Sequence, residues 1–107
     1  MFKKKLIVGG VLTMIAIFPA QALAHTPLCS CYEAGDDTVI CEGGFSDGSS
    51  AAGVEVRVID EDGEVLTKGK INEFNEFEFD KPEGPYKVIL DAGPGHEVEI
   101  KEEEIAE

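Results

Sequence analysis

Basic residues are scarce in this chain of 107 residues, which has nine lysines and arginines against 22 aspartates and glutamates. The formal net charge is −13 at pH 7. A surface of this sign repels nucleic acid and anionic lipid, and it concentrates cations nearby. The charge therefore argues against a nucleic-acid partner, and it permits a cation partner without identifying one.

The sequence also lacks the motifs of the common catalytic sites. Ser49 and Ser50 lie in the stretch SDGSSAAG, without the strand–turn–helix context of a nucleophile elbow. The two histidines, His25 and His96, do not stand in a zinc-protease helix motif. The stretch DAGPGH has no Lys-Ser/Thr pair and no following helix, so it is not a phosphate loop. We therefore predict that the protein is not an enzyme.

The chain has no second long hydrophobic segment after the one at residues 6–18. KKK at 3–5 precedes this run, and ALA at 22–24 follows it, which is the pattern of a cleavable signal peptide. The run is too short for a good membrane-spanning helix. We predict a signal peptide over residues 1–24 and a periplasmic or otherwise extracytoplasmic domain over residues 25–107. Removing the three leader lysines would leave six basic residues against 22 acidic ones.

Helix-length periodicity is absent after residue 24, where short alternating segments lie between Gly, Pro, Asp and Asn turns. The predicted strands are 28–33, 38–46, 54–59, 65–70, 76–80, 86–91 and 97–100. DEDGE, at 60–64, lacks the full set of oxygen ligands of a calcium loop, so we expect a tight turn there. KEEEIAE, at the end, is expected to be a frayed acidic tail. About seven strands with this spacing predict one all-β domain, a small antiparallel β-sandwich.

The cysteines, Cys29, Cys31 and Cys41, are odd in number. In an oxidising compartment, one disulfide and one free thiol form the simplest arrangement. A bridge from Cys41 to either Cys31 or Cys29 would join the first two strands, whereas a Cys29–Cys31 ring would be strained. The alternative is that the cysteines supply thiolates to a soft metal such as Cu(I), although no CxxC motif completes such a site.

The two histidines are the candidate metal ligands. After signal-peptide cleavage, His25 would offer both its α-amine and its Nδ1 to one metal ion, because an unperturbed amine titrates near pH 8. His96 closes the loop before the last predicted strand, and it would add a third nitrogen if the two ends converge. Three nitrogen donors suit Ni(II), Co(II) or Cu(II). The alternative is that His25 merely follows a cleavage site and that His96 caps a turn.

Several motifs resemble those of a known family: FSDG at 45–48, GEVLTKG at 63–69 and DAGPGH at 91–96, together with His25. In these the chain is similar to the small extracytoplasmic accessory proteins of nickel/cobalt energy-coupling-factor transporters. Its middle section also resembles carboxypeptidase-regulatory-like (transthyretin-like) sandwich modules. The resemblance implies a β-sandwich that works with the integral-membrane substrate-binding subunit to acquire Ni(II) or Co(II). It also implies that His25 and His96 contact the metal.

Three functions remain as hypotheses. The first is a metal-binding accessory protein that captures Ni(II) or Co(II) and presents it to a membrane transporter, with nearby carboxylates as weaker ligands or as a steering field. The second is a periplasmic Cu(II) carrier that uses the same ligands in a histidine brace, since copper binds almost any nitrogen site tightly. The third is a metal-free structural or adhesion module.

Overall fold

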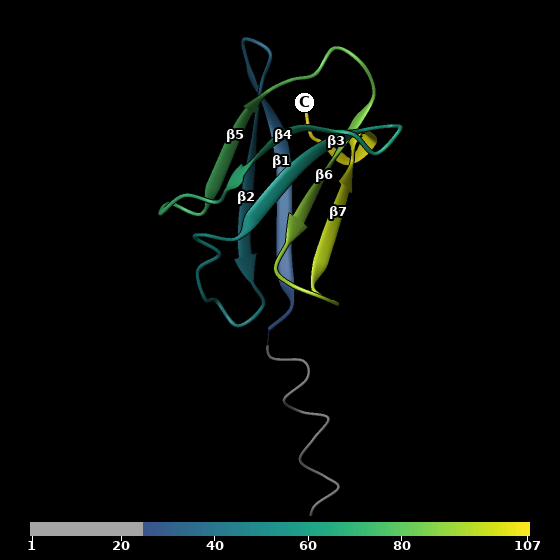
Figure 1. Cartoon of the computed structure of the whole chain (residues 1–107). Coiled ribbons are helices and arrows are strands. Elements are labelled where there is room, and N and C mark those ends of the chain that lie inside the picture. Colours follow the sequence, from purple (N-terminus) through teal and green to yellow (C-terminus); the bar gives the residue numbers. More distant parts are fainter. Residues whose placement is uncertain (1–24) are drawn as a thin grey trace, which may run out of the picture.

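Two antiparallel sheets make up the part of the chain that the computed structural model describes, residues 25–107 (Figure 1). The predicted signal peptide, residues 1–24, lies outside the described residues. Within residues 25–107 no helix is long and apolar enough to cross a bilayer.

Seven strands form the two sheets, and the prediction of an all-β sandwich is confirmed. The first sheet has the order β1-β2-β5, and the second has the order β4-β3-β6-β7. The strands are β1 (Pro27–Gly35), β2 (Thr38–Phe45), β3 (Glu55–Asp60), β4 (Val65–Lys70), β5 (Glu76–Asp80), β6 (Tyr86–Asp91) and β7 (Glu97–Lys101). These bounds differ from the predicted ones by no more than two residues, because the apolar/polar alternation that predicts a strand also decides which face it buries.

The core lies between the two sheets and takes residues from every strand except β4. Val56 and Val58 of β3 are fully buried, as are Val88 and Leu90 of β6. Each of these side chains contributes about 1.5–3 kcal/mol by leaving water. The residues that alternate with them, such as Arg57 and Asp91, point outward, so these two strands separate an apolar inner face from a largely polar outer face. Further core side chains are Cys31, Val39, Cys41, Phe79, Tyr86 and Ile100 from strands and Ala51, Ile71 and Ile105 from outside them.

In the turn at DEDGE, the side chain of Asp60 accepts hydrogen bonds from the backbone of the turn itself. Oδ1 of Asp60 accepts hydrogen bonds from the backbone N–H groups of Asp62 and Glu64, each at 2.9 Å. Gly63 has φ of +85°, a left-handed conformation that glycine adopts without steric cost. The expected tight turn is therefore present between β3 and β4.

The C-terminal segment was expected to be frayed, and this expectation is wrong. A short 3₁₀ helix, η1 (Glu102–Glu104), leads to Ile105, which is only 7% exposed and packs into the core. Ala106 then lies parallel to β1: its N–H donates to the carbonyl of Cys31 at 3.2 Å, and its carbonyl accepts from the N–H of Glu33 at 2.8 Å. One buried side chain and two backbone hydrogen bonds thus hold a segment that its acidic composition marked as solvated.

We expect Ile105→Ala to lower the free energy of unfolding by about 2–4 kcal/mol, the range for truncating a buried aliphatic side chain. Urea unfolding followed by circular dichroism measures the change. Glu103→Ala, at an exposed position in the same segment, is the control and should change stability by less than about 0.5 kcal/mol. Equal stabilities of the two variants would mean that the segment is not docked in solution.

The two sheets also meet where β4 passes over Phe77 of β5. A Cβ atom on Gly69 would overlap the Phe77 ring, with Cζ of that ring at 3.1 Å and Cε1 closer still. Gly69 therefore serves close packing between the sheets, and a side chain at this position would push the aromatic ring out of place.

Gly69→Ala should destabilise the fold by about 1–3 kcal/mol, because the added methyl group overpacks this contact. Gly84→Ala is the matched control, since a Cβ atom there meets nothing within 4 Å. The same urea titrations compare them. A Gly69→Ala protein as stable as the Gly84→Ala protein would show that the Phe77 ring moves aside at no cost.

Candidate metal-binding sites

Three connections lie at one end of the sandwich: the start of β1, the β2–β3 loop and the β6–β7 turn (Figure 1). The strand registers agree with this arrangement, because the β2–β3 loop joins the end of β2 to the start of β3. Pro27 at the start of β1 pairs with Phe45 at the end of β2, and Glu55 at the start of β3 pairs with Asp91 at the end of β6. His25 and His96, at the two outer connections, therefore lie at the same end of the fold.

His25 is held against the β2–β3 loop. Its Nδ1 lies 2.9 Å from Oδ2 of Asp47, and its side chain is 68% exposed. The neighbouring Thr26 exchanges two hydrogen bonds with Ser46: its N–H donates to Oγ at 3.1 Å, and its carbonyl accepts from the Ser46 N–H at 2.8 Å. His25, which would become the N-terminus, is therefore attached to a residue whose backbone is held in place by two hydrogen bonds.

Asp47 is the carboxylate of the FSDG motif, and its two oxygens have separate partners. Oδ1 accepts from the N–H of Ser49 at 2.9 Å and from its hydroxyl at 2.6 Å, while Oδ2 faces His25. The hydrogen bonds from Ser49, with a smaller contribution from the charge of His25, lower the pKa of Asp47 below its ordinary value. An ionised carboxylate therefore stands beside the histidine at neutral pH.

His96 lies in the tight β6–β7 turn. The Nδ1 atom of its imidazole is 3.1 Å from the carbonyl oxygen of Pro94. Its backbone N–H donates to the carbonyl of Gly93 at 2.8 Å. Gly93 and Gly95 have φ of +119° and +77°, which explains why this turn is GPG. The turn presents the imidazole at the surface.

The two imidazoles share one feature that bears on metal binding. Each has its Nδ1 within hydrogen-bond distance of an oxygen, from Asp47 for His25 and from Pro94 for His96. An Nδ1–H that donates to oxygen leaves the Nε2 lone pair available, which is the usual arrangement of a metal-binding histidine and its supporting acceptor. For His25 to chelate through its α-amine and Nδ1, the metal would have to displace Asp47 from Nδ1.

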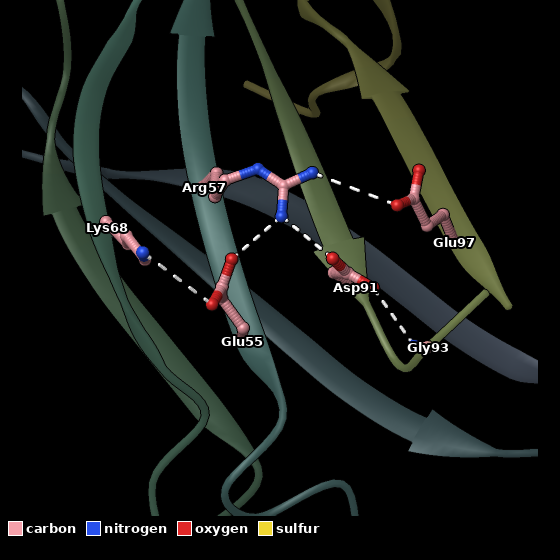
Figure 2. A network of polar contacts seen from close by, with 6 residues as sticks. All are labelled: Glu55, Arg57, Lys68, Asp91, Gly93 and Glu97. Atoms are coloured by element: carbon pink, nitrogen blue, oxygen red, sulfur yellow. Dashed lines mark hydrogen bonds and ion pairs between the residues drawn. The ribbon is translucent and has the colours of Figure 1, made fainter.

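A network of ion pairs on the outer face of the four-stranded sheet supports the β6–β7 turn (Figure 2). Nη1 of Arg57 lies 2.8 Å from Oε2 of Glu55 and 2.9 Å from Oδ2 of Asp91, and Nη2 lies 3.9 Å from Oε2 of Glu97. Oδ1 of Asp91 accepts from the N–H of Gly93 at 2.9 Å. The hydrogen bonds from Arg57 and from that N–H lower the pKa of Asp91. The carboxylate of Asp91 therefore connects β3 to the turn that carries His96.

Basic side chains are concentrated on this outer face. The registers place five of the six basic residues of the described chain there, and Lys81 is the sixth; the five are Arg57, Lys68, Lys70, Lys87 and Lys101. Four acidic residues share the face: Glu55, Asp91, Glu97 and Glu99. The remaining surface, which includes the loop that carries Asp47, therefore has a large excess of negative charge.

The three cysteines lie together on β1 and β2. Cys31 and Cys41 are opposite each other in the register and form a disulfide, one of the two pairings that the sequence left open. Cys29 is a free, half-buried thiol, and burial raises its pKa to about 11. The three sulfur atoms lie within 4.8 Å of one another. Among residues 25–107, no other group of three His, Cys, Asp or Glu ligand atoms is this close, so neither histidine belongs to a preassembled three-ligand set.

Sequence reasoning missed two of the residues that shape these sites. From the sequence, Asp47 was identified only as part of the FSDG motif. An Asp shortly after a strand, two residues before a Ser, is nevertheless the pattern of a turn in which the Asp side chain accepts a backbone hydrogen bond. The role of Arg57 had no local signal, because its partners Asp91 and Glu97 are more than 30 residues away in the chain.

Comparisons with family models, curated proteins and solved structures gave no significant match to this chain. The resemblance to transporter accessory proteins therefore stays a prediction.

The lowered pKa of Asp91 predicts how stability depends on pH. The unfolded chain takes up a proton on this carboxyl at a higher pH than the folded chain, so the contribution of Asp91 to stability is present above its ordinary pKa of 3.8 and is lost as the pH falls through the lower folded value. We expect the unfolding free energy of the wild type to fall more steeply below about pH 4 than that of Asp91→Asn.

Urea unfolding at a series of pH values measures this difference, with Glu103→Gln as a control at an exposed carboxylate. The control should follow the wild-type curve. If the Asp91→Asn curve also runs parallel to the wild type from neutral pH into acid, the Arg57–Asp91 pair does not stabilise the fold.

Proposed function

We propose that the protein is an extracytoplasmic metal-binding accessory protein that captures Ni(II) or Co(II) and presents it to an integral-membrane transporter subunit. The observation that supports this most directly is the placement of His25 and His96 at one end of the sandwich. His96 has an oxygen partner at Nδ1, which leaves its Nε2 free as a metal ligand, whereas at His25 the metal would take Nδ1 from Asp47.

The proposed site forms only after the leader is removed at Ala24, because His25 then acquires a free α-amine. That amine and the imidazole would emerge next to Asp47, which is already within 2.9 Å of Nδ1. A divalent cation that takes Nδ1 would meet the ionised carboxylate at once, and Asp47 would then balance its charge or supply an oxygen ligand. His96 would supply a further nitrogen from the β6–β7 turn.

The exposure of both imidazoles suits capture and transfer. A closed four-ligand site retains its metal, whereas a site with an open position can pass the ion to another protein. The acidic surface around the loops raises the local concentration of cations. Cu(II) would bind the same nitrogen donors more tightly than Ni(II) or Co(II), so metal uptake by cells, and not affinity alone, separates a nickel carrier from a copper carrier.

The test uses the protein purified after export, with its N-terminus identified by mass. We expect calorimetry to show one Ni(II) ion bound per chain, and His25→Ala and His96→Ala should each weaken binding by at least about tenfold. An extra alanine before His25 blocks the amine and should weaken binding equally.

Asp47→Asn and Asp62→Asn form a matched pair, since both remove one negative charge but Asp62 lies in the β3–β4 turn at the other end of the sandwich. Only Asp47→Asn should weaken Ni(II) binding, by about tenfold. Unchanged affinity in the amine-blocked protein would disprove the N-terminal chelate. Unchanged nickel uptake by cells that carry His25→Ala and His96→Ala together would favour the metal-free module.

A further inference from the structure

The cysteine cluster is a second group of candidate metal ligands, separate from the histidine end. Cys29 and Cys31 are two residues apart on β1, so their side chains leave the same face of the strand. Cys41 lies directly opposite Cys31 on β2. Strand alternation and register together bring three sulfur atoms from two strands within 4.8 Å of one another.

The three sulfur atoms are close enough together to share one three-coordinate metal ion once the Cys31–Cys41 bond is broken. Thiolates bind such ions at about 2.3 Å, so three of them in a plane around one ion lie about 4.0 Å apart. The backbone positions of the three cysteines therefore already suit a common metal ion. Only the covalent bond between Cys31 and Cys41 keeps two of the sulfurs closer together than a shared ion allows.

The cluster is partly exposed at Cys29. Cys29 lies at the end of the row of core-facing residues on β1, next to the buried Cys31. Gly43 pairs with Cys29 across the two strands, and a Cβ atom there would point toward the core side chains Ile71 and Ala51. Cys29 itself is half-buried and the other two cysteines are buried, so a bound ion would be largely shielded from water.

We propose that reduction of the Cys31–Cys41 disulfide converts this cluster into a three-thiolate site for a soft monovalent cation of the Cu(I) class. A dithiol reductant supplies two electrons and two protons: its own two thiols become a disulfide, the Cys31–Cys41 bond breaks, and both cysteines become thiols. The cation then displaces the thiol protons of all three cysteines. Soft thiolates favour Cu(I), whereas a structural Zn(II) site takes four ligands and this group has three.

The experiment is an anaerobic titration of the purified protein with Cu(I) in competition with a chromogenic Cu(I) chelator, before and after reduction by a phosphine. The reduced protein should bind one Cu(I) per chain at least tenfold more tightly than the oxidised protein. X-ray absorption should then show three sulfur ligands. Cys29→Ser should reduce that number to two and weaken binding at least tenfold, whereas Ser30→Ala, on the opposite face of β1, should change neither.

A His25→Ala/His96→Ala protein separates this proposal from the nickel site, because it should bind Cu(I) like the wild type. Equal binding by oxidised and reduced protein, or three sulfur ligands in Cys29→Ser, would overturn the proposal. Circular dichroism covers the case in which reduction unfolds the chain. One equivalent of Cu(I) should then restore the β spectrum, since metal binding adds to folding free energy; a chain that binds Cu(I) and stays unfolded would equally overturn it.

Discussion

The antiparallel pairing of β3 with β6 supports both the core and the candidate metal-binding end. On the inner face it sets Val56 beside Leu90 and Val58 beside Val88, and all four side chains are fully buried. On the outer face the same pairing brings Arg57 to the carboxylate of Asp91, at the point where β6 gives way to the turn. Apolar burial provides most of the stability, and the ion pair gives the turn a definite position relative to β3.

The first strand is attached in three ways, and each of them restrains the residue that would become the N-terminus. Strand β1 pairs with β2 along its length, the Cys31–Cys41 disulfide joins the two strands covalently, and Ala106 hydrogen-bonds to its other edge. A disulfide reduces the freedom of the unfolded chain and so favours the folded one. His25 therefore extends from a rigid strand, and its contact with Asp47 limits the orientations of its imidazole.

The two candidate sites differ both in ligand chemistry and in depth. Nitrogen and oxygen donors lie at the exposed loop end, where borderline cations can enter and leave. The sulfur donors lie where β1 and β2 face the core, and burial keeps the thiol of Cys29 protonated until a metal or an oxidant competes for the sulfur. A dication at the loops and a soft monovalent ion at the cysteines would therefore compete little for ligands.

The sequence by itself determined the strands and most of the turns, because period-two alternation and residues such as Gly63 act through local geometry. It also singled out the two histidines and the three cysteines as the chemically distinctive side chains. It left the pairing of Cys41 open, since Cys29 and Cys31 are both near in sequence and only the register places Cys31 opposite it.

Only the tertiary structure decided the contacts between distant segments. These include Asp47 beside His25, Arg57 against Asp91, and the docking of Ile105 where the acidic composition predicted a loose end. Such contacts depend on which strands become neighbours across the sandwich. Which strands become neighbours is determined by the simultaneous burial of all the apolar faces, and a local pattern of residues does not predict that outcome.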